Sequence, residues 1–141
     1  MRKVIFLVLG LILGTSAIGA PTNTVHPIDR WTEKALAATG GITTEIRNVY
    51  SEANKKWDKE LNLVYQRLLS KLSPTDKQAL INTQRSWLKW RQEEVKFNSG
   101  LVLKPDSGTL ALVIADEHSV SLLRERTLAL LRYEGLHDNP Q

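Results

Sequence analysis

The stretch from Thr43 to Leu72 constrains the fold most, because it contains neither proline nor glycine. Its apolar side chains recur every three or four residues, which is the spacing of one face of an α-helix. The sequence therefore predicts one long helix with a single apolar face. The residues of this face are Ile46, Val49, Ala53, Trp57, Leu61, Val64, Leu68 and Leu72.

The next residues, "SPTD" at 73–76, predict a tight break followed by a second helix. Ser73 can cap that helix, Pro74 suits its first position, and Asp76 stands three residues after the cap, as in a capping box with Asp in place of Glu. The second helix is expected to end near Asn98, at the sequence "NSG". So short a turn predicts that the two long helices are antiparallel neighbours.

Two further helices are expected on either side of this hairpin. A short one spans residues 29–38, with Asp29 as its cap and two glycines after its end. Another spans about 109–133, ahead of Gly135. No stretch alternates apolar and polar residues as a strand does. The sequence therefore predicts an all-α fold: a small bundle built on a long antiparallel helix hairpin, plus a third, C-terminal long helix.

The N-terminus has the layout of a secretory signal peptide. Arg2 and Lys3 precede an apolar run at residues 4–13, and small residues follow it. An apolar run of about ten residues is too short to span a bilayer, which takes roughly 20. An uncleaved anchor helix is the alternative interpretation. Cleavage is expected at one of three positions, after Ala17, Gly19 or Ala20.

Removal of residues 1–20 leaves enough chain for one domain with one core. We expect a lead segment at 21–42, the helical domain at 43–134 and a polar tail at 135–141. Removal of the two basic residues of the signal leaves 17 Lys and Arg of 19, against 15 Asp and Glu, so the formal charge falls from +4 to +2. This excess is too small to predict nucleic-acid binding. Without cysteine to carry a lipid, the exported protein is expected to have no membrane attachment.

Polar side chains are predicted to meet across the long hairpin. If the helices are level at the turn, partners have residue numbers that add to about 146. Asn62 then falls opposite Gln84, and Asp58 falls less than one turn from Arg85 and Arg91. A buried arginine needs such partners, because removing one side of a buried ion pair costs about 3 to 5 kcal/mol. The predicted members of this polar clasp are Asp58, Asn62, Tyr65, Gln84, Arg85, Trp87 and Arg91.

Trp87 and Trp90 stand between two arginines, which suggests either a binding surface or a buried seam. A stripe of this kind can bind a glycan or a single-stranded nucleic acid by stacking and charge. Residues three apart, however, diverge by only about 60° around a helix, so one groove of the bundle could take both rings. We favour a buried position in the core for both tryptophans, with Trp57 between them.

Residues suited to catalysis or metal binding do not cluster. His26 and His137 lie far apart in the sequence, and there is no cysteine. Asp116, Glu117 and His118 are consecutive, so they point to different sides of a helix. We therefore expect a protein that is not an enzyme and has no catalytic residue, metal or cofactor.

Three short patterns resemble a known family. An L-N-x-x-Y pattern falls on the first long helix, Q-R-x-W-x-x-x-R on the second and R-x-x-x-L on the third. Together they are similar to the domain of the LprI-type lysozyme inhibitors, which are exported bacterial proteins, over about residues 43–131. The matching residues are Leu61, Asn62, Tyr65, Gln84, Arg85, Trp87, Arg91, Arg126 and Leu130.

The chain departs from the family where members commonly carry two cysteines, because Val49 and Val95 stand at those places. The resemblance implies a lost disulfide replaced by an apolar contact. Closing a loop of about 47 residues would contribute roughly 4 kcal/mol through chain entropy. Burial of each valine, at about 1.5 to 3 kcal/mol, can recover part of it. Gln92 likewise stands where members often have aspartate.

The resemblance implies a protein partner, a lysozyme, and a periplasmic or secreted location. An inhibitor must deliver a group into the acidic cleft where two carboxylates of the enzyme act. We expect the loop from Asn98 to Thr109 to do so, with Lys104 as its cation and Asp106 beside it. A plain connector is the simpler interpretation of this loop.

A second hypothesis is a structural or interaction module of the cell envelope with no lysozyme target. Charge favours it over inhibition of animal lysozymes, which are generally strongly basic, because two positive proteins associate slowly unless local patches compensate.

Overall fold

The computed structural model describes residues 25–139, and this part of the chain contains four α-helices and no strand. The predicted all-α class is confirmed. The expected signal peptide at residues 1–20 lies outside the described residues. The helices are α1 (Pro27–Ala38), α2 (Thr43–Lys71), α3 (Pro74–Val102) and α4 (Thr109–Asp138).

The N-terminal ends of α1 and α3 are capped by different side chains. Ser73 caps α3 as predicted, because its Oγ accepts a hydrogen bond from the backbone N of Asp76 at 3.2 Å. The predicted cap of α1 was wrong. His26 fills that role, with Nδ1 accepting from the backbone N of Ile28 at 3.2 Å. Asp29 therefore lies inside the first turn and is free to pair with another helix.

Two predicted helix ends were also wrong. α3 continues through Asn98 and Gly100 to Val102, and α4 continues past Gly135 to Asp138. The polar tail expected from residue 135 is therefore helical over most of its length. A glycine inside a helix costs only about 1 kcal/mol relative to alanine, which a long packed helix tolerates.

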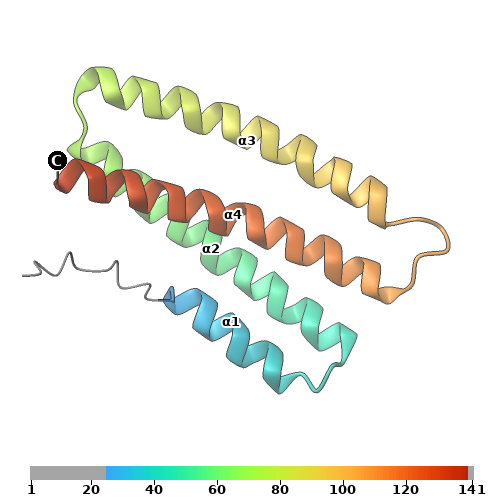
Figure 1. Cartoon of the computed structure of the whole chain (residues 1–141). Helices are drawn as coiled ribbons and strands as arrows, with labels where there is room; N and C mark the ends of the chain where they lie inside the picture. The colour runs from blue at the N-terminus through green and yellow to red at the C-terminus, as the bar shows by residue number, and fades with distance from the viewer. Residues whose placement is uncertain (1–24, 140–141) are drawn as a thin grey trace, which may run out of the picture.

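α4 packs lengthwise on α2, and the two helices run in the same direction (Figure 1). α3 runs back in the opposite direction along α4, where Gln84 meets Arg126. Ion pairs join α2 to α4 in parallel order along both helices, from Arg47–Asp116 to Arg67–Glu134 and Lys71–Asp138.

The predicted close packing of α2 on α3 is not observed. The two helices follow one another through a tight turn, but each packs chiefly against α4 (Figure 1). The reason lies in α4, which buries Leu122, Leu123 and Arg126 at nearly consecutive positions and so has neighbours on more than one side. α3 in contrast buries only Leu80 and Gln84.

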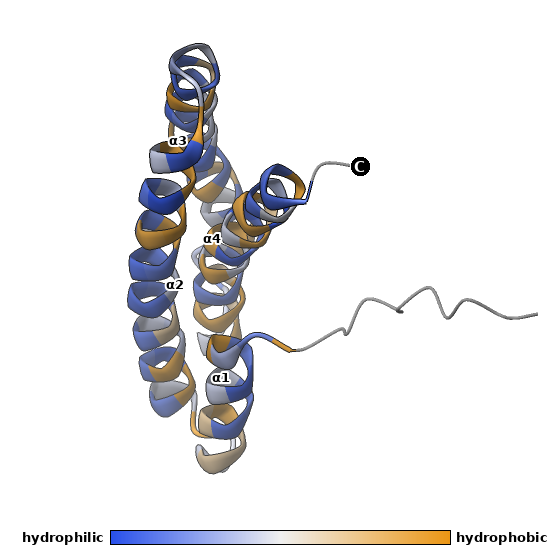
Figure 2. Cartoon of the chain, turned by 90° about the vertical axis from the view of Figure 1, so that its left-hand side faces the viewer, coloured by the Kyte–Doolittle hydropathy of each residue, from blue (hydrophilic) through white to orange (hydrophobic). Residues whose placement is uncertain are grey.

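The buried core lies between α2 and α4. Trp57, Val64 and Leu68 of α2 meet Leu123 and Leu130 of α4. α1 packs along α2 and adds partly buried apolar side chains to this core. Figure 2 shows apolar bands alternating with polar ones along the helices, as the periodicity predicts. None of the helices in residues 25–139 is long and apolar enough to cross a membrane.

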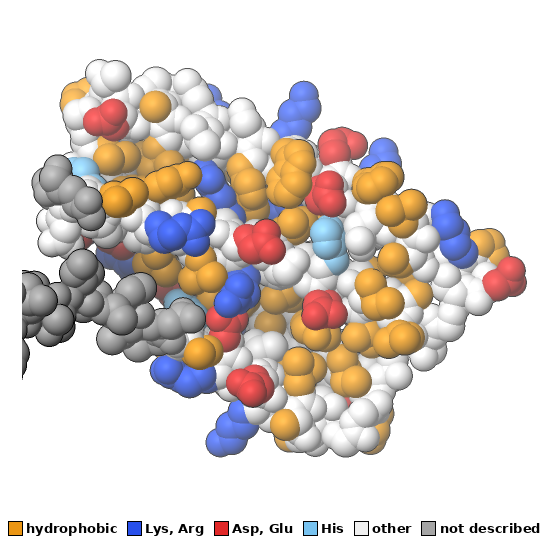
Figure 3. Space-filling model, viewed as in Figure 1, with side chains coloured by type: hydrophobic (Ala, Val, Ile, Leu, Met, Phe, Trp, Pro, Cys, Tyr) orange, Lys and Arg blue, Asp and Glu red, His pale blue; other side chains and the backbone are white. Residues whose placement is uncertain are grey.

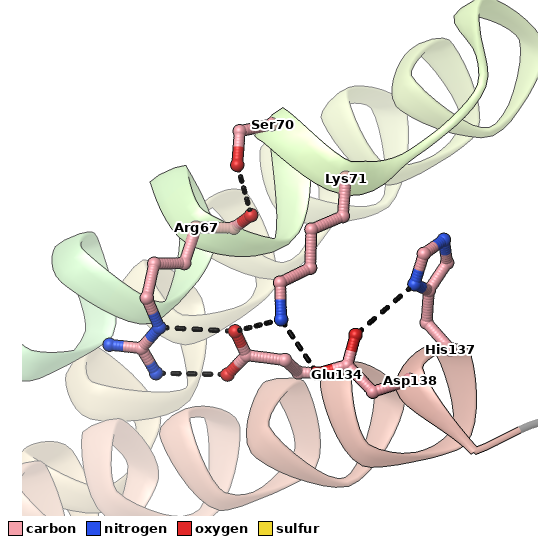
Figure 4. Close-up of polar contacts among 6 residues, drawn as sticks. All are labelled: Arg67, Ser70, Lys71, Glu134, His137 and Asp138. Atoms are coloured by element: carbon pink, nitrogen blue, oxygen red, sulfur yellow. Dashed lines mark hydrogen bonds and ion pairs between the residues drawn. The ribbon is translucent and has the colours of Figure 1, made fainter.

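A charged network fastens the C-terminal ends of α2 and α4 to each other (Figure 4). Arg67 donates to both carboxylate oxygens of Glu134, at 3.1 and 2.9 Å. Lys71 lies 3.0 Å from Glu134 and 2.7 Å from Asp138. The hydrogen bonds from Arg67, together with those from Lys71, lower the pKa of Glu134 from 4.5 to about 2, although burial opposes the shift. The network therefore holds α4 to α2 as long as Glu134 is ionised.

Candidate functional site: a groove between α2 and α3

The residues predicted to clasp α2 to α3 line an open groove between the two helices. The groove has a volume of about 420 Å³, and Leu123 of α4 contributes to its lining. It exists because α2 and α3 each pack on α4 and are not drawn together. Six of the seven predicted members of the clasp border it: Asp58, Asn62, Tyr65, Gln84, Arg85 and Arg91.

The predicted pairs across the groove are not formed. Asn62 donates from Nδ2 to the backbone oxygen of Asp58 at 2.8 Å, within its own helix. Gln84 is buried, and its Oε1 accepts a hydrogen bond from Nε of Arg126 at 2.9 Å. Within residues 25–139, Asp58 makes no ion pair with Arg85, and its carboxylate contact is to Asn62 at 3.5 Å. The polar groups thus surround an open space and do not join its two walls.

Arg126 of α4 supports this site through Gln84, although the sequence predicted for it only a place in a family pattern. The residue is 9% exposed, and its Nη2 atom has no hydrogen-bond partner among residues 25–139. Burial lowers the pKa of its guanidinium group. An arginine in an otherwise apolar helix face was the signal that could have identified it.

Trp87 lies between the core and the arginines. It is partly buried and packs against the core cluster. The guanidinium carbons of Arg91 and Arg126 lie 5.9 and 5.8 Å from the centroid of its ring, within the range of cation–π contacts. The Nε atom of Arg91 is buried and has no hydrogen-bond partner in the described part of the chain.

The predicted burial of Trp90 was wrong, because 49% of this residue is exposed. α3 packs chiefly on α4, and the side of α3 that carries Trp90 is left exposed. Trp57 packs in the core beside the beginning of α1, with its ring centroid 4.5 Å from that of His26. Its predicted place between the other two tryptophans stays a prediction.

Three arginines elsewhere in the protein, Arg47, Arg67 and Arg124, are paired with carboxylates. Arg47 lies 2.7 Å from Asp116, and the hydrogen bond from Arg124 to Asp29 measures 2.7 Å. Both pairs raise the pKa of the arginine, first through the hydrogen bond itself. The arginines of the groove differ, because no carboxylate lies within ion-pair distance of them in residues 25–139.

The predicted partner-binding loop is shorter than expected. Asn98 lies inside α3, where its Oδ1 is buried without a hydrogen-bond partner in the described residues. The loop proper spans residues 103–108 and is closed by Ser107, whose Oγ accepts from the backbone N of Lys104 at 2.8 Å. The ammonium group of Lys104 binds the carbonyl of Gly100 in the last turn of α3. Asp106 is exposed on the loop.

Exposed apolar side chains gather around this loop. They come from the end of α3, the loop itself and the beginning of α4, and Figure 3 shows apolar side chains over this end of the molecule. A group of exposed apolar side chains of this kind is typical of protein–protein contact sites. We call it the apolar tip, and its residues are Phe97, Leu101, Leu103, Leu110 and Ile114.

A larger depression, of about 580 Å³, lies between α2 and the first half of α4. Its polar side chains satisfy one another: Arg47 pairs with Asp116, and Asn54 donates to Ser119 at 3.1 Å. Residues 25–139 contain no group of three or more His, Asp or Glu that could hold a metal ion. Val49 borders a small depression beside α1, and its predicted contact with Val95 stays a prediction.

These features define a class of protein: an all-helical bundle in which residues of two of the sequence patterns line an open groove, and Arg126 of the third pattern binds Gln84 in its wall. The family model described as "Lysozyme inhibitor LprI" matches residues 35–130. The chain belongs to this family, as the motifs predicted.

A solved structure shares the fold. It is the crystal structure of a protein of uncharacterised function from Burkholderia thailandensis, which is similar with a TM-score of 0.73 and 26% sequence identity. The match covers 82% of this chain and 57% of that chain, so the present chain spans little more than half of its length. The comparison with curated proteins found no match.

Proposed function

We propose that this chain is an exported, non-catalytic protein that binds a lysozyme and inhibits it. The observation that carries the proposal is the family match over residues 35–130, which includes the groove, the apolar tip and most of α4. Export is the expectation from the signal-like residues 1–20.

The apolar tip is the surface best suited to enter the cleft of an enzyme. It projects at the end of the α3–α4 pair (Figure 1), and Leu101 and Leu110 are exposed there beside Lys104. Apolar contact would supply the binding free energy. The ammonium group of Lys104 would face the two carboxylates of a lysozyme cleft.

Lys104 is also held in place for this role. Its contact with the Gly100 carbonyl fixes the side chain against the end of α3, where a cation is favoured by the helix dipole. A cation that is already positioned loses less conformational entropy on binding than a free side chain does.

Titration of the purified protein into a panel of lysozymes of different types tests the proposal. We expect inhibition of at least one type at micromolar concentration, measured as slower lysis of a cell-wall suspension. Inhibition of none of them would contradict the proposal and favour an envelope module without a lysozyme target.

A further inference from the structure

The polar side chains that α3 presents to the groove are mainly hydrogen-bond donors. Arg85, Arg91 and Gln84 line the groove from α3, whereas Asp58, Asn62 and Tyr65 line it from α2. Guanidinium groups can only donate. A ligand that fits this wall must therefore present acceptors.

Arg126 sets the orientation of the Gln84 amide. Because Nε of Arg126 donates to Oε1 of Gln84 at 2.9 Å, the acceptor end of this amide is occupied from behind the wall. The Nε2 end, which has two donor hydrogens, is left for the groove. Arg126 thus occupies the accepting end of the Gln84 amide, so that this amide can only donate toward the groove.

One arginine that lines the groove, Arg91, and one that lies behind its wall, Arg126, have unsatisfied donors. Nε of Arg91 and Nη2 of Arg126 are buried and have no hydrogen-bond partner among residues 25–139. Buried donors without an acceptor are rare in proteins because they are costly. Arg47, Arg67 and Arg124 in the same fold each have a carboxylate within 2.9 Å, so the fold is able to pair an arginine where pairing serves structure alone.

The charge and the shape of the groove limit the class of ligand further. Arg85 and Arg91 against Asp58 give the lining a net formal charge of +1, which matches a single negative charge better than a dianion. Leu61, Leu69, Ile81 and Leu88 give it apolar walls, and its volume of about 420 Å³ is in the range for small-molecule sites.

We propose that this groove binds a monocarboxylate with an apolar body, such as an acylated apolar amino acid or the C-terminal carboxylate of a peptide. The carboxylate accepts hydrogen bonds from Arg91, Arg85 and the Gln84 amide, and the apolar side chain lies against the leucines of the groove. Planar guanidinium groups match a carboxylate in geometry as well as in charge. The proposal is independent of lysozyme inhibition, because the groove lies beside the middle of α4 and the apolar tip lies at its beginning.

The test uses purified protein and N-acetyl-leucine, followed by calorimetry and by NMR of the arginine Nε–H groups. We expect saturable binding and a shift of the Arg91 signal. Binding of N-acetyl-leucinamide, which lacks the charge, and of inorganic phosphate should be weaker by about tenfold or more. A pentapeptide that ends in leucine, compared with its C-terminal amide, tells whether a peptide terminus is accepted as well as a free amino acid; binding of either carboxylate supports the proposal.

Two variants and a control complete the test. Arg91→Met should weaken N-acetyl-leucine binding by about tenfold or more, whereas Arg132→Met, an exposed arginine of α4 that does not border the groove, should bind as wild type does. Gln84→Glu gives Arg126 a carboxylate partner and so should fold well, but it places a negative charge in the wall and should abolish binding.

Three results would overturn the proposal. These are the absence of saturable binding by any of the carboxylates, equal affinity for the acid and its amide, and unchanged affinity in Gln84→Glu. Each would mean that the arginines serve only to pack α3 on α4.

Discussion

Trp57 of α2 and Trp90 of α3 differ sharply in burial, so their replacement should change the free energy of unfolding by different amounts. Trp57 is 1% exposed and Trp90 is 49% exposed. Trp57→Ala should lower the free energy of unfolding by about 3 to 5 kcal/mol, because it removes a large side chain from the core. Trp90→Ala should lower it by less than about 1 kcal/mol. Urea denaturation followed by circular dichroism measures both, and equal losses would show that Trp90 is buried.

The apolar tip allows a matched pair of surface substitutions on α4. Leu110, at the tip, is 67% exposed, and Leu136, at the opposite end of the helix, is 63% exposed. If the tip binds a lysozyme, Leu110→Asp should weaken inhibition by about tenfold or more, because it places a carboxylate against the acidic cleft of the enzyme. Leu136→Asp should leave inhibition unchanged.

Equal effects of the two variants on inhibition would place the contact elsewhere. The melting temperature of both should remain close to that of the wild type, since neither side chain contributes to the core.

At the scale of residues, the sequence predicted which side chains gather but not which of them pair. The spacing of Asn62 and Gln84 gives the helix face on which each lies. The bonding partner depends on the helix opposite that face, and Gln84 meets Arg126 because α4 lies there. The residue spacing within α2 and α3 does not indicate which of their faces α4 covers.

At the scale of elements, glycine was a weaker signal for a helix end than expected. Gly100 lies inside α3 and has open space around its Cβ position, whereas Gly40 adopts a φ of 58° in the turn after α1. Only the second glycine is needed for its backbone conformation.

Gly100→Ala should therefore raise the free energy of unfolding by about 0.5 to 1 kcal/mol, because alanine loses less backbone entropy in a helix. Gly40→Ala should lower it, since alanine is strained in the left-handed region. Thermal denaturation of the two variants measures the difference. Destabilisation by Gly100→Ala would indicate that α3 ends before residue 100 in solution.

The packing order of the helices could not be predicted from α2 alone. The single apolar stripe of α2 predicts one partner and does not identify it. α4 was the better indicator, because Val120, Leu122 and Leu123 fall on more than one face of the helix. A helix with apolar residues on several sides lies between others, and this places α4, rather than the hairpin turn, at the centre of the bundle.

At the scale of the whole molecule, acid should weaken the attachment of α4 to α2. The pKa of Glu134 is about 2 in the folded protein and near 4.5 without its partners, so its stabilising effect is complete above about pH 4.5 and is lost as the pH falls toward 2. The free energy of unfolding of the wild type should therefore decline across this window.

Glu134→Gln should show a smaller decline over the same range, because the amide does not titrate. Asp106→Asn, which removes an exposed carboxylate of the α3–α4 loop, should retain the wild-type slope. Urea denaturation at several pH values below 5 measures these slopes. Parallel curves for the wild type and Glu134→Gln would contradict the role of the network.

The position of α4 also determines when this protein can fold. Its contacts with α2 join residues 65 to 69 positions apart, and the apolar face of α2 has no other long helix as its main partner. Closing so long a loop must precede the gain from burial between α2 and α4. A nascent chain that has reached only the end of α3 has no completed core. The core can therefore be completed only after α4 has been synthesised, so that folding is delayed to the last stage of translation or later.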